Sequence, residues 1–122
     1  MLEELDDTND PMTQRVRRQL LSHPPGTLSE EEAAASLFMN KRTLARKLKQ
    51  ENSSFRQIRD DILSQQAASY LCDSKLSIED IAALMNYHDS ANFRRAFKRW
   101  FGQPPEQYRQ RVMSQDTLPT RT

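Results

Sequence analysis

The amino-acid sequence predicts an all-α fold, on three observations. All of its proline and glycine residues lie near the two ends, which leaves residues 29 to 101 without either. Signals for β-strands are almost absent. Apolar residues recur at helical spacing instead, as in Phe93, Ala96, Phe97 and Trp100. We therefore expect helices along most of the chain.

The first predicted helix runs from Pro11 to about Ser22, because proline is well tolerated in the first turn of a helix. Its inward side chains are expected to be Val16, Leu20 and Leu21. The sequence HPPGT then ends the helix.

Two shorter helices follow. Ser29 is a typical N-cap, and the three glutamates after it suit the positive end of a helix dipole. This helix is expected to end near Phe38. After a tight turn, Asn40 can cap a second helix, in which Leu44 and Leu48 lie one turn apart and face inward.

A longer helix is predicted from about 54 to 72 and is followed by a second short pair. The residues expected on the buried side of the long helix are Phe55, Ile58, Ile62, Leu63, Ala67, Tyr70 and Leu71. Ser77 then caps a helix rich in apolar residues, and NYHD turns the chain. Ser90 is expected to cap the last helix of the pair.

Charge is concentrated in the second helix of each pair. The whole chain has a net charge of +1, but five of its 17 acidic residues lie in the first ten positions. The remainder therefore contains 18 cations and 12 anions. Half of all lysines and arginines fall in residues 40–50 and 90–101, and neither window contains an acidic residue. Two such runs at corresponding positions favour a shared role over two unrelated solvated faces.

A short helix, a tight turn and a basic helix form the order of a helix-turn-helix. In that unit the first helix supports the second, which enters a DNA major groove. Phosphates favour lysine and arginine on its flanks, and arginine or asparagine can read base edges. A connecting helix of this length spans about 28 Å. The two basic helices are therefore expected about one DNA turn, roughly 34 Å, apart.

The segments AAASLFMNKRTLARKLKQENSSF and SIEDIAALMNYHDSANFRRAFKRWFGQPPEQYR resemble the two motifs of the AraC/XylS family of bacterial transcription regulators. The resemblance covers about residues 12 to 112. It implies seven helices that form two helix-turn-helix subdomains joined by a long linker helix. The implied ranges are 11–113 for the whole domain, about 29–51 and 77–101 for the subdomains, and about 54–72 for the linker.

The resemblance also implies which residues meet DNA. In the first recognition helix they are Asn40, Lys41, Arg42, Thr43, Ala45, Arg46 and Lys49. In the second they are Ser90, Ala91, Asn92, Arg94, Arg95 and Lys98. Of these, Lys49 and Lys98 are expected nearer to phosphate than to bases.

The chain departs from the family pattern at three turn positions. Asn52 and Asn86 stand where the family usually has glycine, and asparagine can also take the left-handed conformation that ends a helix. Phe38 stands where a small residue is common, which leaves the angle between the first two motif helices open.

Nothing in the sequence predicts catalysis, a cofactor or a metal site. There is no nucleophile elbow, phosphate-binding glycine loop or paired-carboxylate arrangement. His88 is expected to be a turn residue, His23 has no partner with which to form a metal site, and Cys72 is expected to be a small apolar residue within a helix. The single cysteine excludes an internal disulfide.

The expected partner is double-stranded promoter DNA, with RNA polymerase subunits as further candidates. The alternative is a helical adaptor that docks its basic faces on an acidic protein, such as a polymerase subunit. No apolar run is long enough for a membrane span, and the acidic start does not resemble a signal peptide. We expect a cytoplasmic protein at the nucleoid.

The two ends read as connecting segments. Residues 1–10 are acidic and polar, and residues 114–122 resemble a flexible tail. We expect the C-terminal domain of a longer regulator, monomeric in isolation and dimeric in its parent.

Overall fold

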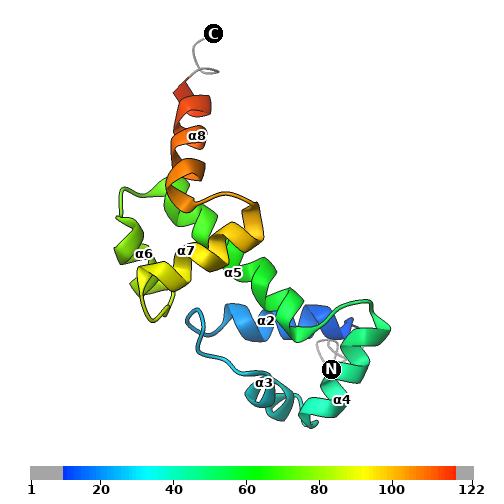
Figure 1. Cartoon of the computed structure of the whole chain (residues 1–122). Helices are drawn as coiled ribbons and strands as arrows, with labels where there is room; N and C mark the ends of the chain where they lie inside the picture. Colours follow the sequence, from blue (N-terminus) through cyan, green and yellow to red (C-terminus); the bar gives the residue numbers. More distant parts are fainter. Residues whose placement is uncertain (1–9, 118–122) are drawn as a thin grey trace. The chain divides into compact units, whose positions relative to one another are not determined.

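The computed structural model describes residues 10–117, which contain seven helices and no strand (Figure 1). In chain order the helices are α2 (Met12–Leu21), α3 (Glu30–Ser36), α4 (Lys41–Gln50), α5 (Phe55–Asp73), α6 (Ile78–Leu84), α7 (Ser90–Phe101) and α8 (Pro105–Thr117). The predicted all-α class and the seven helices are confirmed.

The chain forms two compact units, and the division falls within α5, after Ile62. In the first unit α2, α3 and α4 pack on one another, and the beginning of α5 completes the core. Its buried residues are Met12, Val16, Leu28, Ala33, Ala34, Leu44, Leu48, Phe55, Ile58 and Ile62.

The second unit is built from the rest of α5 with α6, α7 and α8. Its core residues are Leu63, Ala67, Leu71, Ile78, Ile81, Ala82, Met85, Phe93 and Phe97. Partly buried aromatic side chains, among them Trp100 and Tyr108, pack against this core. Arg109 of α8 donates hydrogen bonds to the carbonyls of Leu71 and Ser74, at 3.1 and 3.3 Å, and so satisfies backbone oxygens at the end of α5.

Side-chain caps begin the short helices, as predicted. Ser29 forms a capping box with Glu32 at the start of α3. Asn40 Oδ1 accepts the backbone N–H of Thr43 at 2.8 Å, and Ser77 Oγ caps α6 in the same way. The predicted cap of α7 was wrong by one residue. Asp89, and not Ser90, accepts the N–H of Asn92 at 2.8 Å, so Ser90 is the first helical residue.

Three helices end in the same hydrogen-bonded turn, in which one residue has a positive φ. That residue is Phe38 after α3, Asn52 after α4 and Asn86 after α6, with φ of 63°, 62° and 64°. In each turn the next residue donates its N–H to a carbonyl five positions earlier, as Tyr87 does to Ala82 at 2.9 Å. The left-handed conformation expected of both asparagines is confirmed.

Other details of the sequence prediction need correction. Leu21 is 58% exposed, because Leu20 and Leu21 point about 100° apart on a helix and only Leu20 faces the core. Cys72 lies in α5 but is exposed. Helix α8 continues to Thr117, into the stretch predicted as a tail. The other tail residues, 118–122, and residues 1–9 lie outside the described part of the chain.

The start of α2 is held by a carboxylate from a distant part of the chain. Pro11 precedes α2 and provides no side-chain cap. Instead, Glu51 accepts the backbone N–H groups of Met12 and Thr13 at 2.8 and 2.9 Å. Desolvation raises the pKa of the Glu51 carboxyl, but the hydrogen bonds from Met12 and Thr13 together lower it by a larger amount. The pKa of Glu51 therefore lies below its ordinary value.

Replacing Glu51 with glutamine is expected to lower stability at pH 7 by about 1 kcal/mol, the usual cost of a lost N-cap. A depressed pKa contributes stability above the unfolded-state pKa, about 4.3, and this contribution disappears as pH falls through the folded-state value. In urea unfolding, the stability gap between wild type and Glu51→Gln should therefore be present at pH 7 and should close at acid pH, once Glu51 is protonated in the folded state. An equal gap at neutral and at acid pH would contradict this role.

Candidate nucleic-acid interface

Two buried leucines anchor the first basic helix, α4, in the core of the first unit. Leu44 and Leu48 are fully buried, one turn apart, against α2, α3 and the start of α5. The predicted DNA-contacting side chains occupy the other faces. Those that are exposed are Asn40, Lys41, Arg42, Ala45, Arg46 and Lys49, while Thr43 is half-buried.

Within the described residues, most cationic side chains of α4 form no ion pair with an acidic side chain of the protein. Lys41 approaches Glu31 at 3.9 Å, which is a long and exposed pair. Within residues 10–117, no ion pair links Arg42, Arg46 or Lys49 to a carboxylate. Arg42, Thr43 and Arg46 together line a hollow of about 480 Å³ on this helix. A polyanion is therefore the charge partner that this face lacks.

The second basic helix, α7, has the same construction with aromatic anchors. Phe93 and Phe97 are fully buried and Ala96 is 5% exposed. Of the residues predicted to meet DNA, the exposed ones are Ala91, Arg95 and Lys98, and the half-buried ones are Ser90, Asn92 and Arg94. The basic face and the apolar face predicted from the sequence thus lie on opposite sides of one helix.

Arg94 is engaged by the protein itself. Its guanidinium lies 2.6 Å from Glu106 Oε2 in α8 and 3.4 Å from Glu79 Oε2 in α6, and it donates to Ser90 Oγ at 3.0 Å. The hydrogen bond from Arg94 lowers the pKa of the Glu106 carboxyl. Arg94 therefore ties α6, α7 and α8 together, and its predicted contact with bases stays a prediction.

Arg95 is the neighbouring arginine and is exposed. Its guanidinium donates to Asn92 Oδ1 on the preceding turn of α7. This contact joins two predicted DNA-contacting residues into one polar group on the helix surface. An arginine supported by a neighbouring side chain is well placed to make a bidentate contact with a guanine.

The N-terminal ends of the helices differ in charge. In α3 and α6 acidic residues fill the first turn, where they complement the helix dipole. In α4 and α7 the first turn contains no acidic residue. The positive end of α4, capped by the neutral Asn40, is thus available to phosphate oxygens, whereas at α7 the Asp89 carboxylate already occupies this end.

Three residues important for this surface were missed in the sequence. Asp89 caps α7, and the preference of N-caps for aspartate could have suggested it as readily as Ser90. Glu79 and Glu106 hold Arg94, but they lie 15 and 12 residues away from it. No local sequence signal could have identified those pairs.

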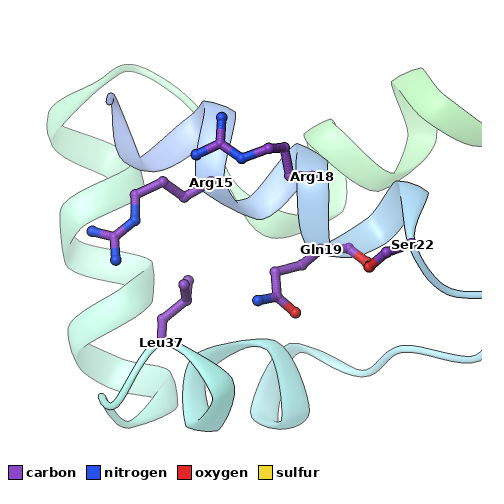
Figure 2. Close-up of a pocket in the computed structure, with 5 residues that line it drawn as sticks. All are labelled: Arg15, Arg18, Gln19, Ser22 and Leu37. Atoms are coloured by element: carbon purple, nitrogen blue, oxygen red, sulfur yellow. The ribbon is translucent and has the colours of Figure 1, made fainter. Parts of the chain in front are cut away.

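A separate pocket of about 290 Å³ lies between α2 and the end of α3 (Figure 2). Arg15, Gln19 and Leu37 point toward this space in Figure 2. Arg18 also lines the pocket, and it pairs with Asp10 at 2.6 Å. None of these lining residues was predicted to meet DNA, and no role was predicted for the pocket.

None of the seven helices in the described part of the chain has the length and apolar character needed to cross a membrane. Within residues 10–117, no group of three or more histidine, cysteine or acidic side chains is arranged to hold a metal ion.

Two helix pairs, each presenting a supported basic helix, define a protein of the helix-turn-helix class. A family model described as a helix-turn-helix domain matches residues 33–111. The ornithine utilization regulator of Pseudomonas aeruginosa is 38% identical over 104 residues, which are 85% of this chain and 31% of that protein. The chain belongs to the AraC-type helix-turn-helix family of transcription regulators.

Solved structures share the fold. The C-terminal domain of AraT, a response regulator from Geobacillus stearothermophilus, has a TM-score of 0.75 and 32% identity, and the match covers 83% of this chain and 85% of that one. The DNA-binding domain of AdpA, a global transcriptional factor solved in complex with a target DNA, has a TM-score of 0.77 and 24% identity over 90% of this chain and 99% of that one. The present chain spans about a third of the length of the curated relatives it matches.

Proposed function

We propose that this chain is the DNA-binding part of a bacterial transcription regulator, and that it binds double-stranded promoter DNA sequence-specifically. The observation that carries the proposal is the pair of helices α4 and α7, each with buried leucine or phenylalanine anchors beneath a cationic face and no acid in its first turn. The related domain of AdpA was solved with its target DNA, which supports the same partner here.

Each basic helix is proposed to enter a major groove, and the two grooves are proposed to be successive ones on the same duplex. Lysines and arginines on both helices would neutralise phosphates, while Arg42, Arg46 and Arg95 would be the side chains closest to base edges. No catalytic step and no cofactor are part of this function. The protein would act in the cytoplasm at the nucleoid.

The test is selection of bound sites from random duplex DNA, followed by affinity measurements across a salt series. We expect two preferred half-sites whose centres lie about 10 base pairs apart. If roughly six phosphates are neutralised, affinity should fall by about 10³-fold between 50 and 200 mM salt. A single half-site would contradict the two-groove arrangement. Absence of DNA binding even at low salt would contradict DNA binding itself and favour the adaptor alternative.

The assembly of the protein is also a matter of proposal. The isolated chain is proposed to be a monomer that contains both recognition helices, and the longer parent to be a dimer. Light scattering of the chain, alone and with a selected duplex, tests the first statement. Contact with RNA polymerase subunits is proposed only as an addition to DNA binding, and copurification with the polymerase on promoter DNA would test it.

A further inference from the structure

Phe38, in the turn between α3 and α4, combines two unfavourable features. Its φ is +63°, and its side chain is 96% exposed. A bulky residue in the left-handed region is a clear outlier, because its Cβ crowds the backbone. An exposed aromatic ring, in turn, gains nothing from burial.

The fold does not require a phenylalanine at this position. Phe38 donates its N–H to Ala35 at 3.0 Å, and Met39 donates to Ala34 at 3.0 Å, so the turn is formed by backbone atoms alone. The two other turns of the same construction carry Asn52 and Asn86, a residue type that tolerates this conformation. Backbone strain that persists without a structural reason is typical of functional positions.

The position of Phe38 in the chain indicates what it could touch. It lies two residues before Asn40, the N-cap of α4, and thus close to the first turn of α4, which carries Lys41 and Arg42. Figure 1 shows the short turn that joins α3 to α4. The region 40–50 contains no acidic residue. The charge of this end of α4 suits the polyanion proposed above as its partner, and Phe38 is a large apolar group beside that basic face.

We propose that the ring of Phe38 packs against an apolar part of the DNA at the edge of the groove that α4 enters, either deoxyribose carbons or a thymine methyl group. This inference rests on the proposed DNA binding. An uncharged ring adds affinity by excluding water, and it displaces no counterions. Its contribution should therefore not change the salt dependence of binding.

The experiment uses two substitutions that keep the left-handed turn, Phe38→Gly and Phe38→Asn. Both remove the ring without loss of buried surface, and both suit a positive φ. We expect the melting temperature to rise by about 2–5 °C for Phe38→Gly. DNA affinity for a selected site should nevertheless fall by about 5- to 50-fold for both variants, with an unchanged salt slope. Phe38→Trp should retain most of the affinity.

Duplexes with uracil in place of thymine separate the two sources of apolar contact. If the ring meets a thymine methyl group, wild type loses affinity for one uracil-substituted position and Phe38→Asn does not. If the ring meets deoxyribose, no single uracil substitution distinguishes the two proteins. Leu21→Asn is the control, because Leu21 is also an exposed apolar residue, at 58%, but lies in α2.

Several results would overturn the inference. One is that stable Phe38→Gly and Phe38→Asn variants bind with full affinity to a duplex that wild type binds. This holds even if the variants lose transcriptional activity. An equal loss with Leu21→Asn would also overturn it. Failure of wild type to bind any duplex would instead contradict the proposed function, so the two failures are distinguishable.

Discussion

Replacing Phe97 with alanine is expected to cost about 3–5 kcal/mol and to unfold most of the second unit at 37 °C. Phe97 is fully buried, and its ring centroid lies 4.6 Å from that of Phe101 and 5.3 Å from that of Tyr108. It therefore joins α7 to α8 and to the core beneath. A unit of this size buries only a modest apolar surface in total, so the loss of one fully buried ring is a large fraction of its stability.

Thermal and urea unfolding followed by circular dichroism would measure the loss. We expect the melting temperature of the second unit to fall by at least about 15 °C. Lys98→Ala is the matched control, because Lys98 is the next residue and is exposed, and its substitution should change stability by less than about 0.5 kcal/mol. Amide signals from α2 to α4 should persist in Phe97→Ala, since the first unit has its own core. A loss no larger than that of Lys98→Ala would contradict the role of the ring.

Replacing Arg95 with alanine is expected to lower DNA affinity by about 1–3 kcal/mol and to relax preference at one base pair. Arg95 is exposed on α7 and supported by Asn92, so it is available for a bidentate base contact. Its removal should leave the melting temperature nearly unchanged. Fluorescence anisotropy with a selected duplex and its single-base-pair variants would measure both effects.

Arg94→Ala is the matched comparison, since the two arginines are adjacent and differ in their partners. Arg94 pairs with Glu79 and Glu106, so its loss should reduce stability slightly, by up to about 1 kcal/mol for exposed pairs. It should affect sequence preference less than Arg95→Ala does. If Arg95→Ala weakens binding equally on all sequences, Arg95 is a phosphate contact. If Arg94→Ala relaxes preference at a base pair, Arg94 must leave its carboxylates to read DNA.

The parts of the fold that depend on neighbouring residues were predictable from the sequence. Ser29, Asn40 and Ser77 cap their helices through atoms three positions away, and the buried stripe of α4 follows directly from helical spacing. The resemblance to a known family added the positions of the left-handed asparagines. Errors of one position, as with Leu21, arose where adjacent residues were equally suitable.

The remaining features depend on contacts between distant parts of the chain. The side chain of Glu51 accepts a hydrogen bond from the backbone of Met12, 39 residues earlier in the chain. The sequence near either residue contains no signal that predicts this contact. Arg94 was placed on the predicted interface by its position in α7, but its partners come from α6 and α8. Phenylalanine rarely takes the left-handed conformation that Phe38 has, so neither its φ nor its exposure could be predicted from the sequence.

Helix α5 contributes side chains to both cores, yet no residue belongs to both, since Ile62 belongs to one core and Leu63 to the other. Each half can accordingly accumulate substitutions without disturbing the side chains that support its counterpart. Under the proposed two-groove binding, the preference for each half-site would therefore evolve separately, while contacts with the other half-site are kept.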